Sequence, residues 1–208
     1  GINYNSIKNL LGAFHSPELL YVNSSYLKTL PMDEILSGYG ELLKHSLLTS
    51  EEDFAYLVDS LVLQPEHLGE HVKRAIIFKS KIVEKDPFDQ GIRQCLNAGH
   101  TFGHALESCQ NSGNQKVPHG IAVILGLYLE GRAYARSSKN DNVYCWLNML
   151  ENLIDTYGLK RYFAFTDSDV SRIIKTIKKD KKNSEDKIII CAIKSPGEIV
   201  LNYSLECS

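Results

Sequence analysis

The sequence of 208 residues has no apolar run that approaches the roughly 20 residues of a membrane span. It has no excess charge of either sign, because 23 basic and 25 acidic side chains give a formal charge of −2. A chain this close to neutrality has no general electrostatic reason to bind nucleic acid or an anionic membrane. With 43% hydrophobic and 23% charged residues, the composition excludes a disordered chain. We therefore expect a globular protein that binds neither nucleic acid nor membrane.

The sequence also lacks cysteines in the number and spacing of a disulfide framework or a zinc site. The five cysteines are an odd number, and none has the C-x-x-C spacing, so they fit neither a disulfide framework nor a thiolate zinc site. We expect reduced, mostly buried cysteines in a cytoplasmic protein. The first residues, GINYN, form no signal peptide and include no initiating methionine. The chain is therefore expected to be a piece of a longer protein.

Glycine loops that cradle phosphates are absent as well. The 14 glycines include neither G-x-G-x-x-G nor G-x-x-x-x-G-K, the patterns that place backbone N–H groups around nucleotide phosphates. Gly38 and Gly40 lie inside a helical pattern instead. The long predicted helices also leave no room for a βαβ nucleotide fold. If a nucleotide takes part in the function, most of its site is expected to lie elsewhere.

Helical periodicity of apolar residues dominates what is present. It predicts helices over 31–49, 51–63, 66–84, 93–110, 119–136, 143–157 and 167–179. The helix over 119–136 is apolar on nearly every side, so we expect it at the centre of the core. Only 187–193 and 199–203 read as strands, and the turn residues between them predict a β-hairpin. The predicted fold is mainly α, a single multi-helical domain with a small C-terminal β-hairpin.

The segment 93–107 has the richest polar pattern. On one helix, at about 100° per residue, Arg93, Asn97, His100 and His104 share a stripe about 60° wide. Two glycines interrupt the same segment, and each costs about 1 kcal/mol in a helix interior. We therefore expect something to approach that backbone closely. Solvated helix faces favour Lys, Glu and Gln, so this composition favours a functional site.

A zinc site is one chemistry that the histidines could support. Two histidines and a carboxylate are a usual zinc set with an open fourth position. Spacing alone does not identify the remaining members of such a set. His119 begins a predicted helix, where a lone histidine is more often structural, and Glu41 with Lys44 reads as an ordinary surface pair.

A rival metal motif occurs at His67-Leu68-Gly69-Glu70-His71, which matches H-x-x-E-H. In inverted metalloproteases such a motif holds zinc through two histidines, and its Glu acts as the base. Five-residue patterns also arise by chance, and charged neighbours favour a solvated helix face here.

A lysine cluster near residue 180 also has two interpretations. It consists of Lys178, Lys179, Lys181 and Lys182. A solvated turn before the hairpin is the default. A clamp for phosphate or carboxylate is the alternative, because flexible ammonium groups bind such anions as point charges. Spacing does not distinguish the two.

Residues 96–107, LNAGHTFGHALE, followed by VPHG at 117–120, resemble the signature of the 3-dehydroquinate synthase family. The resemblance continues in order through 8–14, 26–31, 37–44 and 180–183, so it covers essentially the whole chain. It implies the C-terminal part of a two-domain enzyme. Residues 1–208 would form the metal- and substrate-binding domain, with 1–30 connecting it to a missing N-terminal domain that carries a glycine-rich NAD loop.

The resemblance also implies a reaction. The family converts 3-deoxy-arabino-heptulosonate 7-phosphate to 3-dehydroquinate and phosphate in the shikimate pathway, as a phosphorus–oxygen lyase that uses NAD and Zn²⁺ or Co²⁺. The sugar phosphate is thus the expected small-molecule substrate, and a homodimer is the expected assembly. By resemblance, Glu41, His100 and His119 hold the metal, and His104 falls on the proton-transfer histidine. This piece alone would be catalytically inactive.

Further residues are assigned only by the resemblance. Lys44 and Asn97 fall on catalytic positions, and the substrate contacts are Asn9, Lys79, Arg93, Asn97 and Lys181, with Lys182 as the alternative to Lys181. The residues expected to border NAD are Lys8, Tyr26, Leu27, Lys28 and Thr29. Two departures from the family, Ser37 for a common Asn and Gly40 for a common Ala, weaken the cofactor contacts more than the metal site.

Three alternatives remain open. Related sugar-phosphate cyclases share the fold, metal and NAD but tend to differ at the positions of Asn97 and His104, so this sequence favours the dehydroquinate product. A zinc protease built on His67, Glu70 and His71 is a distant alternative. A non-catalytic oligomerisation module that has kept its site residues is the third.

Overall fold

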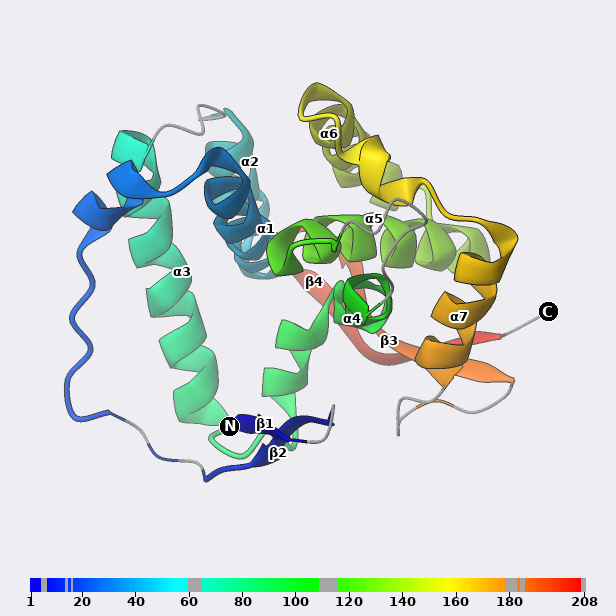
Figure 1. The fold of residues 1–208 in the computed structure, drawn as a ribbon, viewed down its shortest axis with the longest axis horizontal. Helices are drawn as coiled ribbons and strands as arrows, with labels where there is room; N and C mark the ends of the chain where they lie inside the picture. Colours follow the sequence, from blue (N-terminus) through cyan, green and yellow to red (C-terminus); the bar gives the residue numbers. More distant parts are fainter. Residues whose placement is uncertain are drawn as a thin grey trace.

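A computed structural model describes residues 1–4, 7–13, 15, 17–59, 65–108, 116–178, 183 and 186–206, with backbone alone at 3, 7–9, 65 and 66. Seven α-helices occur within these residues (Figure 1): α1 (Met32–Thr49), α2 (Glu51–Asp59), α3 (Pro65–Lys85), α4 (His100–Ser108), α5 (His119–Ser138), α6 (Val143–Thr156) and α7 (Asp167–Lys178). Short 3₁₀ helices are η1 (Ser24–Thr29), η2 (Ile92–Asn97) and η3 (Leu159–Phe163). The strands are β1 (Ile2–Tyr4), β2 (Ile7–Leu11), β3 (Lys187–Ser195) and β4 (Glu198–Glu206). The predicted mainly helical fold with a C-terminal hairpin is confirmed.

Helix α5 lies at the centre of the core, as its apolar sequence predicts. Ile121, Ile124 and Leu125 are fully buried on it, and α1, α4 and α6 all pack against it. Figure 1 shows α5 crossing the middle of the molecule, with α1 to α3 on one side and α6 and α7 on the other. Helices α1 and α4 are therefore both held by α5.

Glycines bring α1, α4 and α5 into direct backbone contact. A Cβ atom at Gly40 would lie 2.1 Å from the carbonyl oxygen of Gly120, and one at Gly126 would lie 1.9 Å from that of Gly99. A Cβ at Gly103 would lie 2.9 Å from another carbonyl oxygen of α5. The predicted close approach to the backbone at Gly99 and Gly103 is confirmed, and the approaching element is α5.

The C-terminal hairpin closes one side of this helical core. β3 and β4 pair antiparallel, with Ile190 opposite Tyr203, and Gly197 occupies the turn with a φ of +83°. The backbone N–H of Gly197 donates to the carbonyl oxygen of Leu47 at 2.8 Å, which fastens the turn to the end of α1. Ile190 is buried and joins the hairpin to the core.

The structure corrects the prediction of one helix over 93–110. The 3₁₀ helix η2 ends at Asn97, and α4 begins at His100. Between them Gly99 has a φ of +74°, a left-handed conformation that interrupts a right-handed helix. The common stripe calculated for a continuous helix is therefore wrong for Arg93 and Asn97, although His100 and His104 do share α4.

A second correction concerns the N-terminal residues, where no strand was predicted. β1 and β2 form a two-stranded antiparallel ribbon, with Ile2 opposite Leu11. β1 is three residues long, too short for the alternation that identifies a strand.

None of the described helices has the length and apolarity of a membrane span.

Candidate metal centre

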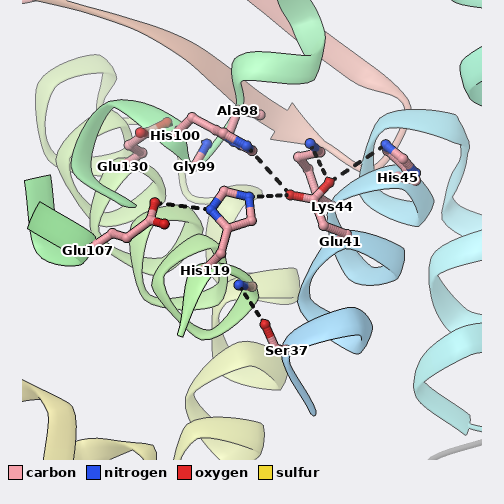
Figure 2. Close-up of polar contacts among 11 residues, drawn as sticks. Ser37, Glu41, Lys44, His45, Ala98, Gly99, His100, Glu107, His119 and Glu130 are labelled. Carbon is pink, nitrogen blue, oxygen red and sulfur yellow. Dashed lines mark hydrogen bonds and ion pairs between the residues drawn. The ribbon is translucent and has the colours of Figure 1, made fainter. Parts of the chain in front are cut away.

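Three half-buried side chains from three helices point at one another (Figure 2). Glu41 comes from α1, and His100 and His119 are the first residues of α4 and α5. Glu41 Oε1 lies 3.5 Å from His100 Nε2 and 3.3 Å from His119 Nε2. One ligand atom from each residue lies within 4.8 Å of the other two. The structure thus brings together the three residues expected to hold a metal.

Backbone packing explains this convergence. Glu41 follows Gly40, His119 precedes Gly120, and His100 follows Gly99 in the sequence, so each candidate ligand adjoins a glycine of the helix contacts described above. The hydroxyl of Ser37 adds a bond between the same helices, since its Oγ accepts from the backbone N–H of Gly120 at 3.0 Å. The close contacts that only glycine permits therefore set the distances within the site.

Hydrogen bonds fix the orientation of both imidazole rings. His100 Nδ1 lies 3.0 Å from the carbonyl oxygen of Ala98, and His119 Nδ1 lies 3.1 Å from Glu107 Oε2. A carbonyl or carboxylate oxygen accepts, so Nδ1 carries a proton in each ring. Both Nε2 atoms then face Glu41. Such outer partners commonly fix the tautomer of metal-binding histidines.

Oxygen Oε1 of Glu41 is the orphaned polar atom at the centre of the group. It is buried and, among the described residues, has no hydrogen bond of acceptable geometry, although two imidazole nitrogens face it. Two Nε2 atoms and a carboxylate oxygen around one point are a usual donor set for Zn²⁺ or Co²⁺. The residues present therefore fit a metal ion.

Electrostatics keep two of the candidate ligands, Glu41 and His100, in forms that bind metals. Burial raises the pKa of Glu41, but the close approach of His119 Nε2 and the charge of Lys44 outweigh it and hold that pKa well below its usual value. Burial, and then the charge of Lys44, lowers the pKa of His100 to about 3. The His119 pKa is raised, first by its close contact with the Glu41 carboxylate. A carboxylate and a neutral His100 are the forms a metal requires.

Lys44 is a buried cation beside the triad. Its side chain is 4% exposed, and Nζ lies 2.8 Å from Glu41 Oε2. Burial lowers the pKa of Lys44, while the ion pair with Glu41 opposes that shift without cancelling it. The ion pair leaves the other oxygen of Glu41 directed at the two histidines, as Figure 2 shows.

His104 borders the triad without being part of it. Its ring centroid lies 5.0 Å from that of His100 and 6.1 Å from that of His119, and its side chain is exposed. His104, Glu107 and His119 form a second group of potential metal ligands. That group shares His119 with the first and therefore forms the rim of the same site.

The expected substrate residues are more dispersed. Asn97 lines a hollow of about 210 Å³ between η2 and the hairpin, together with Gln94 and Asp89. Arg93 is held in the η2 segment, where its guanidinium donates to the carbonyl oxygen of Pro87 at 2.8 Å. Lys79 lies on α3, and its charge helps to lower the pKa of Lys44.

The remaining residues expected to contact NAD or substrate lie on other elements or outside the part of the chain that the structure describes. Tyr26, Leu27, Lys28 and Thr29 form part of η1, which packs against α3, and Tyr26 is 74% exposed. Lys8 and Asn9 belong to β2, and their side chains lie outside the described part of the chain. Lys181 and Lys182 lie outside the described residues altogether.

The H-x-x-E-H motif lies on α3 and is split by burial. His67 is exposed, while His71 is 6% exposed and its ring centroid lies 4.8 Å from that of Tyr56. Glu70 forms ion pairs with Lys73 and Arg74. Neither histidine belongs to the groups of three potential ligands found among the described residues. The interpretation as a solvated face holds for His67 and is wrong for the buried His71.

Two acidic residues of the site were missed from the sequence. Glu107 contacts His119, as described above. Glu130 of α5 is 3% exposed, and its carboxylate accepts from the backbone N–H groups of Gly99 and Phe102. A signal for Glu130 existed in the sequence, because a carboxylate inside a helix that is otherwise apolar must find partners when buried.

Comparison with known proteins finds relatives along nearly the whole chain. The sequence is 34% identical to 3-dehydroquinate synthase of Parabacteroides distasonis over 99% of this chain and 58% of that protein. It is 36% identical to the same enzyme of Staphylococcus aureus, over 98% of this chain and 56% of that one. The chain thus spans a little over half the length of these relatives.

Solved structures share the fold. A structure of 2-deoxy-scyllo-inosose synthase complexed with carbaglucose-6-phosphate, NAD⁺ and Co²⁺ superposes with a TM-score of 0.81 at 22% identity, over 99% of this chain and 58% of that one. A structure of 2-epi-5-epi-valiolone synthase from Streptomyces hygroscopicus with NAD⁺ and Zn²⁺ bound superposes with a TM-score of 0.66 at 19% identity, over 98% of this chain and 56% of that one.

The family model described as 3-dehydroquinate synthase N-terminal matches residues 1–37. Since the model described as 3-dehydroquinate synthase C-terminal matches residues 38–183, the chain belongs to the 3-dehydroquinate synthase family.

Proposed function

We propose that this chain is the metal- and substrate-binding part of an enzyme that converts 3-deoxy-arabino-heptulosonate 7-phosphate to 3-dehydroquinate and phosphate, with NAD and Zn²⁺. The convergence of Glu41, His100 and His119 is the observation that carries the proposal. Relatives named 3-dehydroquinate synthase support the reaction. Cyclases of the same fold that bind NAD⁺ with Co²⁺ or Zn²⁺ support the cofactors.

The proposed metal ligands are Glu41 Oε1 and the Nε2 atoms of His100 and His119. Their donor set leaves a fourth position open, which distinguishes a catalytic from a structural site. Zn²⁺ bound there supplies Lewis acidity that lowers the pKa of a coordinated hydroxyl group. Glu107 and the carbonyl group of Ala98 hold the two rings so that both Nε2 atoms face the metal position.

Nearby side chains fit the remaining tasks. The substrate carries a carboxylate and a phosphate, and charge-assisted hydrogen bonds from cations are the strong means of holding such groups. Lys44 supplies a cation beside the triad, Lys79 lies close enough to act on the charge of Lys44, and Arg93 supplies a cation from η2. Asn97 supplies an amide at the hollow between η2 and the hairpin. His104 is exposed next to His100 and can move a proton to or from the substrate.

NAD and a further domain complete the proposal. The segment before α1 exposes an unusual number of large apolar side chains, namely Ile2, Tyr4, Leu10, Leu11, Leu19, Leu20, Tyr21, Val22, Tyr26 and Leu30. Exposed apolar patches of this kind mark contact surfaces. We propose that another domain of the complete enzyme covers them and holds NAD next to Lys8 and residues 26–29. This chain alone would then be inactive.

A related sugar-phosphate cyclase is the second candidate, because structures of two such enzymes superpose on this chain. Asn97 and His104 favour dehydroquinate, since related cyclases tend to differ at both positions.

The test uses the full-length protein with NAD and Zn²⁺. We expect phosphate release from 3-deoxy-arabino-heptulosonate 7-phosphate and a product with the mass of dehydroquinate. A hexose 6-phosphate run in parallel is the control for the second candidate. Turnover of the hexose phosphate alone would contradict the proposed substrate, and no turnover of either would contradict the proposed enzyme. The isolated 208-residue chain is expected to release no phosphate.

A further inference from the structure

Glu130 is a buried carboxylate that binds the backbone at the start of another helix. It lies in α5 and is 3% exposed. Its Oε2 accepts from the N–H of Gly99 at 2.8 Å, and its Oε1 accepts from the N–H of Phe102 at 3.1 Å. The two donors lie on either side of the first residue of α4, His100. A carboxylate from α5 therefore caps the N-terminus of α4.

The sequence at the start of α4 explains why the cap comes from a distance. A helix N-terminus usually takes an oxygen from the side chain at the N-cap position, which here is Gly99. Gly99 has no side chain, and a Cβ atom there would lie 2.7 Å from Leu127 Cγ and 2.9 Å from the carbonyl oxygen of Val123. The close packing on α5 thus excludes a local cap, and Glu130 supplies the oxygen atoms instead.

The two bonds enclose the metal-ligand candidate His100. Gly99 precedes His100 and Phe102 follows it by two residues, so Glu130 fixes the backbone on both sides of the imidazole. The carbonyl group of Ala98, on the other side of Gly99, accepts from His100 Nδ1 at 3.0 Å. A shift of Gly99 would therefore displace both His100 and the acceptor that sets its tautomer. Figure 2 shows Glu130 beside Gly99, with Nε2 of His100 directed towards Glu41.

We propose that Glu130 is a positioning residue for His100, acting through the backbone of Gly99 and Phe102 to aim His100 Nε2 at the metal position. The inference rests on the proposed metal centre and adds to it a residue that touches neither metal nor substrate. Partners of this kind, one step beyond the ligands, commonly contribute 10- to 100-fold to metal affinity. Glu130 differs from Glu107 because it orients its histidine through the main chain rather than through the ring.

The test substitutes Glu130→Gln in the full-length protein that contains these 208 residues. A glutamine keeps the shape but directs an NH₂ group at one of the two N–H donors, so one bond is lost. Zn²⁺ affinity, measured by competition with a chromophoric chelator, is expected to fall about 10- to 100-fold. The visible absorption spectrum of the Co²⁺-loaded chain is expected to change, because that spectrum reports ligand geometry. If E130Q does not fold, Glu130→Asp, which retracts the carboxylate by one methylene, is put through the same measurements.

Two control variants separate positioning from general loss of stability. Glu151→Gln makes the same change on α6, where Glu151 accepts from Tyr128 Oη at 3.2 Å. Leu150→Ala removes a buried side chain of α6 away from the site. Both controls are expected to keep the wild-type affinity and Co²⁺ spectrum, although L150A unfolds earlier.

The outcomes are distinct. Wild-type affinity and spectrum in the Glu130 variant would overturn the inference, as would an equal loss of affinity in L150A. A wild-type chain that binds neither Zn²⁺ nor Co²⁺ would contradict the proposed metal centre itself. If His100→Ala abolishes binding while E130Q binds as the wild type does, the metal centre stands and only the role of Glu130 fails.

Discussion

Replacing Gly126 by alanine tests how helix packing sets the geometry of the site. The new Cβ atom would lie 1.9 Å from the carbonyl oxygen of Gly99, against about 3.4 Å for an ordinary contact. The start of α4 must then withdraw by about 1.5 Å, several times the roughly 0.2 Å tolerance of metal–ligand distances. Overpacking of this kind lowers the free energy of unfolding by about 1–3 kcal/mol. Each kcal/mol lowers the Tm of a chain of this size by about 2–4 °C.

Gly131→Ala is a matched control in the same helix. A Cβ atom at Gly131 would meet side-chain atoms of Trp146 and Leu147 on α6, at 2.5 and 2.8 Å, rather than the backbone of α4. Thermal unfolding and Zn²⁺ titration of both variants form the assay. We expect both to unfold earlier and only G126A to lose metal affinity. Wild-type affinity in G126A, or an equal loss in G131A, would refute the reasoning.

Three further predictions concern single side chains. Glu107→Gln removes the carboxylate at His119 Nδ1 and should weaken Zn²⁺ binding about 10- to 100-fold with little change in the unfolding temperature. In the full-length enzyme His104→Ala should keep the metal and lose about 10²- to 10⁴-fold in kcat, and near-normal turnover would make His104 structural. Burial, and then Lys44, lowers the pKa of His45 to about 4. As the pH falls, His45 therefore binds a proton in the unfolded chain before it does so in the folded chain. The free energy of unfolding is then unaffected by His45 above about pH 6.5 and falls by about 3 kcal/mol between pH 6.5 and pH 4. Urea unfolding of His45→Gln should show a shallower pH dependence over that window, and an unchanged slope would contradict it.

Local patterns predicted most helices because their apolar faces repeat at helical spacing. The prediction failed at residues 97–99, where the chain turns through the left-handed conformation of Gly99. That turn depends on the contact between Gly99 and Gly126, which are distant in the sequence. A single sequence shows that a glycine is present but not which helix approaches it.

Local spacing likewise predicted some residues of the site and missed those that depend on tertiary contacts. Spacing singled out His100 and His104, since both lie on one face of α4. Glu41 and His119 looked ordinary by spacing, and only the family resemblance pointed to them. Their convergence depends on the contact of Gly40 with Gly120, a tertiary feature. Glu130 could have been suspected as a lone carboxylate in an apolar helix, but its partner could not have been named.

Metal analysis of the ligand variants tests the central claim most directly. The account predicts one Zn²⁺ per wild-type chain after loading and dialysis. Glu41→Gln, His100→Ala and His119→Ala should each lose it. His67→Ala, on the rival motif of α3, and His104→Ala, beside the triad, should both retain it. Retention of Zn²⁺ by His100→Ala, or its loss from His67→Ala, would contradict the metal centre and the mechanism built on it.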